Sequence, residues 1–124
     1  MHPHYLLHDP STVFSPALLF YRDVIRDNIT KLIACVGDPA RLRPHVKTHK
    51  TREIVRMQLQ AGITKHKCAT IAEAEMLASC GVPDVLLAYP LVGPNCGRMV
   101  KLLKAYPNSR FSILGDDPQS MRAV

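Results

Sequence analysis

The sequence predicts an α/β fold, a partial (β/α)8 TIM barrel with about four strand-helix units. Apolar runs of strand length alternate with amphipathic segments of helical spacing, at a repeat of roughly 20 to 25 residues that is typical of such barrels. A closed barrel needs about 200 to 250 residues, whereas the chain has 124. We therefore expect a strand and a helix over residues 1–40, preceding the first half of a truncated barrel over 41–124.

The amino-terminal part is predicted to begin with an irregular segment. Residues 1–15 contain three histidines and two prolines, and we interpret them as a surface tail in preference to a metal site. Pro16 to Tyr21 is an apolar run of strand length. Apolar residues from Val24 to Val36 then follow helical spacing, and Gly37 is a typical helix end.

The barrel part is predicted to contain four strands. Pro44 removes a ladder hydrogen bond from the first one, so we expect a bulge or local irregularity there. Thr70 and Glu73 have the spacing of a capping box, in which the Glu73 carboxylate returns to the Thr70 amide. Asp117 followed by Pro118 indicates the start of a last helix. The strands are predicted at 42–47, 64–68, 85–88 and 110–114, with helices at 54–61, 70–80 and around 99–103.

The stretch from Arg41 to Arg52 holds seven basic or potentially basic side chains among twelve residues. In an extended segment, Arg43, His45 and Lys47 share one face. Lys47 then lies near the carboxyl end of a strand, where ligands and catalytic side chains collect in α/β folds. A lysine amine in such a place is suited to attack a carbonyl and form a Schiff base.

Composition narrows the classes of protein. Apolar residues make up 47% and charged residues 21%, an ordinary globular composition. The net charge of +6 admits a nucleic-acid partner, but an anionic cofactor explains the basic stretch equally well. Four widely spaced cysteines indicate free, mostly buried thiols. No apolar run approaches the roughly 20 residues of a membrane span, so a reduced, cytoplasmic location is expected.

Three separated motifs carry a family resemblance. They are Arg41-Leu-Arg-Pro-His-Val-Lys-Thr-His-Lys50, Cys68-Ala-Thr-Ile-Ala-Glu-Ala-Glu75 and Leu86-Leu-Ala-Tyr-Pro-Leu-Val-Gly-Pro94. In this order they resemble the amino-terminal part of the D-threonine aldolase and D-serine dehydratase group. The resemblance implies an alanine racemase-like barrel that binds pyridoxal 5'-phosphate. It also implies that Lys47, the first lysine of the basic motif, carries this cofactor as a Schiff base.

The expected site residues follow from this motif and from the strand ends. Lys47 is the catalytic candidate, and Lys47, His45 and Tyr89 are the cofactor-binding candidates. His45 and Arg43 alternatively fill the barrel interior with hydrogen-bonded groups, and Tyr89 alternatively packs a loop. No metal ligand is assigned. The resemblance places the phosphate-binding loops later in the barrel and a divalent metal in a carboxyl-terminal β domain, both beyond Val124.

The expected function is that of a lyase acting on D-hydroxy amino acids, of D-threonine aldolase or D-serine dehydratase type. An amino-acid racemase, a non-catalytic protein that binds pyridoxal phosphate and a nucleic-acid-binding fragment stay open as alternatives. We expect a small D-amino acid as substrate, a homodimer of the full-length protein, and neither a nucleic-acid nor a membrane partner. The 124-residue chain alone is expected to lack full activity.

Overall fold

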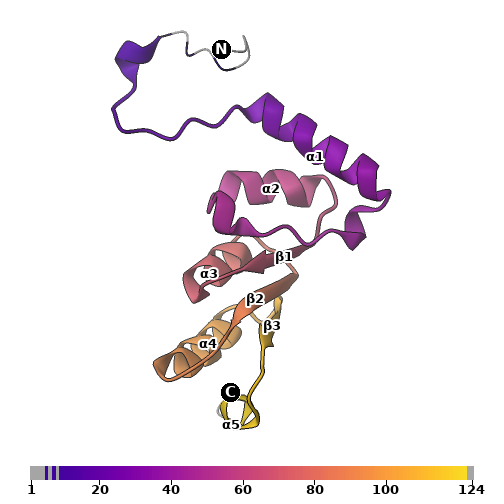
Figure 1. Ribbon diagram of the computed structural model, residues 1–124, viewed down its shortest axis with the longest axis vertical. Coiled ribbons are helices and arrows are strands. Elements are labelled where there is room, and N and C mark those ends of the chain that lie inside the picture. The colour runs from indigo at the N-terminus through magenta and orange to yellow at the C-terminus, as the bar shows by residue number, and fades with distance from the viewer. Residues whose placement is uncertain (1–4, 6, 8, 123–124) are drawn as a thin grey trace.

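The computed structural model of the chain describes residues 5, 7 and 9–122. Strands and helices alternate from β1 onward (Figure 1), which confirms the α/β class. Short 3-10 turns lie at Pro10–Thr12, Pro39–Arg41 and Val46–Thr48. The helices are α1 (Arg22–Val36), α2 (Arg52–Gln60), α3 (Ile71–Ser79), α4 (Pro94–Ala105) and α5 (Pro118–Met121), and the strands are β1 (Lys65–Cys68), β2 (Asp84–Pro90) and β3 (Arg110–Leu114).

The three strands form one parallel sheet in the order β1-β2-β3. Each strand pairs with the next one in the sequence, as in a barrel. Helices α3 and α4 lie on the same side of this sheet (Figure 1), where the core is closed by side chains from both layers. The core side chains Leu77, Val82, Val85, Leu87 and Met99 are each at most 1% exposed.

The opposite face of the sheet is left open in the described part of the chain (Figure 1). The register places Lys67, Leu86 and Ser112 side by side, and all three are half-buried. Their neighbours along the strands point to the helix-covered face, because successive side chains alternate. In a complete barrel the open face is the one that lines the interior.

Helix ends agree with the sequence signals. Gly37 follows α1 with φ 83° and Gly81 follows α3 with φ 82°. Glycine adopts this left-handed conformation without the clash that a Cβ causes, which favours it after a helix. The predicted strand at 110–114 also has the same bounds as β3. The two helix ends were predictable because each has a glycine as its own local stop signal.

The first predicted barrel strand, at residues 42–47, is not formed. Only His45 pairs, through an isolated parallel bridge with Lys67, and the chain then enters the Val46–Thr48 turn. Pro44 has no N–H to donate, although its carbonyl oxygen accepts from the Lys67 amide at 2.8 Å. The irregularity expected at Pro44 is therefore confirmed, and the described chain has three full strands plus this bridge.

The amino-terminal segment packs little against the rest. Residues 16–20 form no strand and pair with no described residue, so the strand predicted for Pro16 to Tyr21 is wrong for this structure. A strand needs a partner, and none is present here. Phe14 is 94% exposed, and of α1 only Ile29 is buried. In the predicted surface tail over 1–15 the three histidines lie outside the described residues, and the described residues are all exposed.

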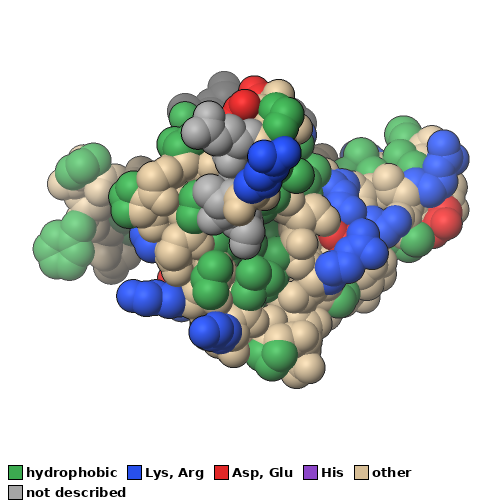
Figure 2. Space-filling model, turned by 90° about the horizontal axis from the view of Figure 1, so that it is seen from below, with side chains coloured by type: hydrophobic (Ala, Val, Ile, Leu, Met, Phe, Trp, Pro, Cys, Tyr) green, Lys and Arg blue, Asp and Glu red, His purple; other side chains and the backbone are tan. Residues whose placement is uncertain are grey.

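On the face seen in Figure 2, the basic side chains do not form a single patch. Lys and Arg side chains lie there in several separate places, with apolar side chains between them. The four cysteines are free, with Cys68 buried, Cys35 exposed and the other two half-buried. Within the described residues, no helix combines the length and apolar character that crossing a membrane requires.

Candidate functional site

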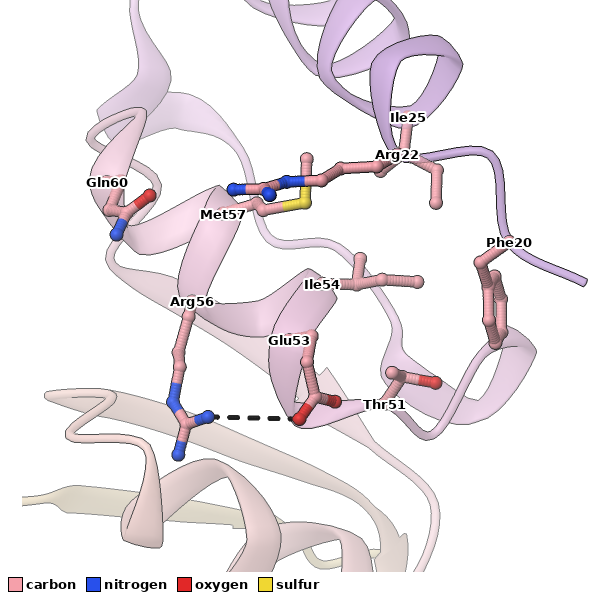
Figure 3. Close-up of a pocket in the computed structure, with 9 residues that line it drawn as sticks. All are labelled: Phe20, Arg22, Ile25, Thr51, Glu53, Ile54, Arg56, Met57 and Gln60. Atoms are coloured by element: carbon pink, nitrogen blue, oxygen red, sulfur yellow. Dashed lines mark ion pairs between the residues drawn. The ribbon is translucent and has the colours of Figure 1, made fainter.

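A cavity of about 550 Å³ opens between the start of α1 and helix α2 (Figure 3). Phe20 and Ile25 face Ile54 and Met57 across it, and an Arg56–Glu53 ion pair of 3.9 Å lies at its border. None of the residues predicted for the site lines it. The candidate site therefore has to be built from the ends of the strands.

Lys47 lies in a tight turn beside the carboxyl-terminal end of β1. His45 pairs with Lys67 in parallel register, so the chain reaches Lys47 just past the last residue of that strand. Val46, fully buried, anchors the start of the turn, and its carbonyl oxygen accepts from the amides of His49 at 3.1 Å and Lys50 at 2.7 Å. The Lys47 side chain is exposed and has no hydrogen-bond or ion-pair partner among the described residues.

His45 has a defined proton arrangement. Its Nδ1 accepts from the Lys47 backbone N–H at 3.3 Å, so a neutral ring carries its proton on Nε2. Burial lowers the pKa of His45, the cations of Lys47 and Lys67 lower it further, and the Glu73 carboxylate opposes them. A backbone hydrogen bond with Lys67 also raises the pKa of His45, but burial is the first cause and the net direction is down. His45 is therefore a neutral imidazole near pH 7 with its proton on Nε2.

Glu73 was predicted from the sequence as part of a capping box, but not as a member of the site region. Its side chain is 6% exposed although it is charged. One carboxylate oxygen accepts from the Ala69 amide at 2.8 Å, and the other lies 3.4 Å from the Lys50 Nζ. The Thr70 hydroxyl accepts from the Glu73 amide at 3.1 Å as predicted, but the carboxylate bonds Ala69 and not Thr70. The capping-box spacing was the available signal, since it puts this carboxylate beside a strand end.

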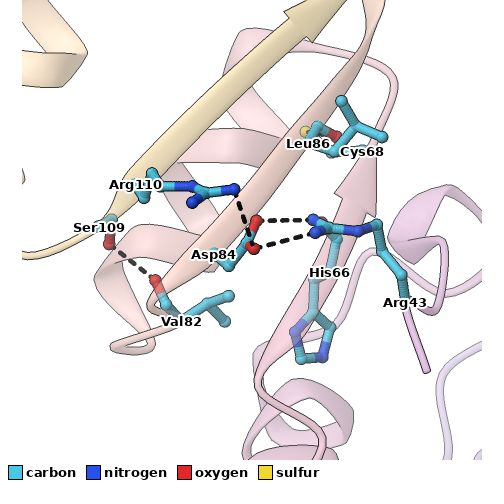
Figure 4. A network of polar contacts seen from close by, with 8 residues as sticks. All are labelled: Arg43, His66, Cys68, Val82, Asp84, Leu86, Ser109 and Arg110. Atoms are coloured by element: carbon cyan, nitrogen blue, oxygen red, sulfur yellow. Dashed lines mark hydrogen bonds and ion pairs between the residues drawn. The ribbon is translucent and has the colours of Figure 1, made fainter. Parts of the chain in front are cut away.

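Arg43 is held away from Lys47 by a network at the other end of the strands (Figure 4). Its guanidinium donates to both oxygens of Asp84 at 2.7 and 2.9 Å, and to the His66 carbonyl oxygen at 3.3 Å. Arg110 lies 3.9 Å from the same carboxylate. Hydrogen bonding from Arg43 lowers the pKa of Asp84. The sequence left open whether Arg43 contacts the cofactor or fills the barrel interior as a hydrogen-bonded group. Its bonds to Asp84 and His66 support the second role.

Tyr89 and His49 differ in how they are placed. Tyr89 is the second-to-last residue of β2, and its side chain is 58% exposed at the same carboxyl-terminal edge as Lys47. His49 is half-buried and accepts from the Thr51 amide through Nδ1 at 3.1 Å, while its buried Nε2 has no described partner. Of these two residues, Tyr89 is therefore the one whose side chain is exposed at the strand ends.

Known proteins match both the fold and the sequence, although no protein-family model does. The solved structure of D-threonine aldolase from Filomicrobium marinum superposes on 90% of the chain with a TM-score of 0.77 and 28% identity. A D-threonine aldolase from Arthrobacter sp is 38% identical over 83 residues, which is 67% of the chain. The chain is a homologue of the D-threonine aldolases.

This D-threonine aldolase homologue also matches a dehydratase. The D-threo-3-hydroxyaspartate dehydratase of Delftia sp. (strain HT23) is 33% identical over 78 residues, 62% of the chain. The chain spans only about a fifth of the length of these two relatives, 21% and 20%, and 30% of the solved structure. The match to a D-threonine aldolase structure confirms the predicted partial barrel.

The side chains around Lys47 fit an anionic cofactor that carries an aldehyde. Lys47 offers an exposed primary amine, and His45 offers a neutral donor beside it. Lys50 and Lys67 add positive charge near the turn, against the single carboxylate of Glu73. Among the described residues, no group of three or more His, Cys, Asp or Glu side chains is placed to hold a metal ion.

Proposed function

We propose that this chain is the part of a pyridoxal-phosphate-dependent lyase that holds the cofactor on Lys47. The observation that carries the proposal is the exposed Lys47 amine, on a turn beside the carboxyl-terminal end of β1, next to the neutral His45. The names of the relatives support a lyase of D-hydroxy amino acids, because they are an aldolase and a dehydratase of such compounds.

Each residue has a distinct part in this proposal. The Lys47 amine binds the cofactor's aldehyde carbon covalently and, when released, holds or moves a proton at the substrate's α-carbon or hydroxyl. His45 donates through Nε2–H to an oxygen of the ligand, and Tyr89 borders the site from the end of β2. When bound, pyridoxal phosphate supplies an electron-withdrawing ring that stabilises negative charge at the α-carbon.

The reaction of the complete protein is proposed as retro-aldol cleavage, with loss of water as the second candidate. Cleavage of D-threonine gives glycine and acetaldehyde, whereas dehydration of a 3-hydroxy amino acid gives a keto acid and ammonia. The D-serine dehydratase type, a homodimer in the cytoplasm and a divalent metal outside the present residues belong to the same proposal. An aldehyde assay and a keto-acid assay on the complete protein distinguish the two reactions, and an inverted amino acid indicates a racemase.

A trapping experiment tests the cofactor anchor separately from the reaction. The complete protein is incubated with pyridoxal phosphate, reduced with borohydride and digested, and the pyridoxyl group is located by peptide mass spectrometry. We expect the label on Lys47 and its loss in Lys47→Ala. Lys50→Arg and Lys67→Arg are matched controls that remove other nearby primary amines. A label that persists elsewhere while Lys47 stays unmodified contradicts the proposal.

A further inference from the structure

Glu73 lies on helix α3, but its carboxylate is buried, and helix formation alone does not explain why a charged group is buried there. An ionised side chain taken out of water costs several kcal/mol unless it is paired and hydrogen-bonded. Glu73 meets this condition through two groups from separate parts of the chain, the Ala69 amide at the end of β1 and the Lys50 ammonium. The carboxylate thus connects the β1 end to the turn that carries Lys47.

Lys50 closes that turn in an unusual conformation. Its φ is 50°, in the left-handed region, which costs about 1 kcal/mol for a residue with a Cβ. Its amide bonds the Val46 carbonyl oxygen at 2.7 Å, and its ammonium reaches Glu73. Because the Lys50 side chain is 64% exposed, this ion pair adds little stability by itself. Its relevance is geometric, because it connects the end of this turn to the first turn of α3.

The same carboxylate acts on the histidine beside Lys47. The groups that act electrostatically on His45 are the cations of Lys47 and Lys67 and the anion of Glu73. Glu73 is the one of these that raises the pKa of His45. Removing the Glu73 charge therefore shifts the titration of His45 downward, in addition to releasing Lys50.

We propose that Glu73 is a positioning residue for the Lys47 site. By holding the end of β1 and Lys50 together, its carboxylate fixes the turn from Val46 to Lys50 so that the Lys47 amine stays at the carboxyl-terminal edge of the sheet. This inference rests on the proposed function, because it concerns how readily Lys47 meets its cofactor. Glu73 itself does not touch the reacting atoms.

Glu73→Gln tests the inference, with Glu75→Gln as the matched control on the exposed side of α3. Glutamine keeps an oxygen for the Ala69 amide but loses the negative charge. Pyridoxal phosphate is added to the complete, cofactor-free protein, and the label at Lys47 is trapped with borohydride. We expect the labelling rate of Glu73→Gln to be about tenfold below that of the parent, because a displaced amine reacts more slowly. We also expect the His45 titration, followed by histidine C2-hydrogen exchange and mass spectrometry, to move to lower pH. Glu75→Gln is expected to change neither.

Failure of this inference is distinguishable from failure of the proposed function. If the parent protein takes no label on Lys47, the cofactor anchor is wrong. If the parent is labelled, and Glu73→Gln is labelled at the same rate with an unchanged His45 titration, the positioning role is wrong. Should Glu73→Gln not fold, Lys50→Met removes the other partner of the ion pair on an exposed side chain. Its labelling at Lys47 is expected to slow in the same direction, and an unchanged rate overturns the inference.

Discussion

Arg43 and Asp84 join the irregular segment before Lys47 to the start of β2 through two parallel hydrogen bonds of 2.7 and 2.9 Å. The two side chains are 28% and 18% exposed. The segment around Pro44 has only one bridge to the sheet, so this bidentate pair replaces part of the missing strand pairing. The network is therefore expected to contribute to stability and to hold the start of the segment that leads to Lys47.

Arg43→Met is expected to lower the free energy of unfolding by about 2 kcal/mol at pH 7, because the half-buried Asp84 carboxylate loses both hydrogen bonds from the charged guanidinium. The Asp84 pKa is below its usual 3.8 in the folded protein, so this contribution is present above pH 3.8 and is lost as the pH falls through the folded pKa. Urea unfolding at pH 7 and at a series of pH values below 3.8 measures both effects. Arg26→Met, which breaks an exposed ion pair with Asp23, is the control and should cost under about 0.5 kcal/mol.

The thiols are expected to differ sharply in reactivity. Cys68 is fully buried, and burial, with the Glu73 charge as a second cause, raises its pKa to about 12. The thiolate is the nucleophile, so Cys68 should resist iodoacetamide in the folded protein. Exposed Cys35 should be alkylated first. Peptide mass spectrometry after timed alkylation measures this, with urea-unfolded protein as the control in which both react, and early labelling of Cys68 would contradict the structure.

Elements with local signals were predictable from the sequence. Gly37 and Gly81 stop their helices, Thr70 caps α3, and the run from Arg110 to Leu114 forms β3 with the predicted bounds. Each of these depends on residues within one or two turns of the element. The partial barrel was predictable for the same reason, because it consists of repeated strand-helix units and each unit has its own local signals.

Long-range partners were not predictable. The alternation that grouped Arg43 with Lys47 ends at Val46, where the chain turns and Lys47 leaves the extended segment. Arg43 pairs with a residue 41 positions later, and no local pattern indicates that distance. The Glu73 carboxylate pairs with Lys50, a residue whose positive φ is a conformation that sequence patterns suggest mainly for glycine or asparagine.

Thr70→Ala should lower the free energy of unfolding by about 1 kcal/mol, the usual cost of losing an N-cap oxygen. The Thr70 hydroxyl accepts from the Glu73 amide at 3.1 Å, and alanine leaves that amide without this partner. The matched control is Thr30→Ala, where the hydroxyl donates to the Arg26 carbonyl oxygen within exposed α1. That change should be neutral or slightly stabilising, because alanine is the better helix former. Equal losses in both variants, measured by urea unfolding, would argue against the cap.

His66 should make the protein acid-sensitive well above the range of the carboxylates. Its side chain is fully buried, its Nε2 lies 3.0 Å from the Gln58 Oε1, and its Nδ1 has no described partner. Burial is the first cause that lowers its pKa to about 4, followed by the nearby His49 and Arg43. The unfolded chain binds this proton near pH 6.5, so the stability from neutral His66 is complete above pH 6.5 and is lost as the pH falls to about 4.

The difference of the two pKa values corresponds to about 3 kcal/mol of unfolding free energy lost between pH 7.5 and pH 4. His66→Gln is expected to be less stable than the parent at pH 7.5 but to lose about 3 kcal/mol less on acidification, because an amide does not titrate. Urea unfolding at the two pH values gives both numbers. Val85→Ala, a cavity in the same core without a titrating group, is the control and should keep the parental pH dependence. If His66→Gln loses as much stability on acidification as the parent, then His66 is not the buried neutral imidazole described here.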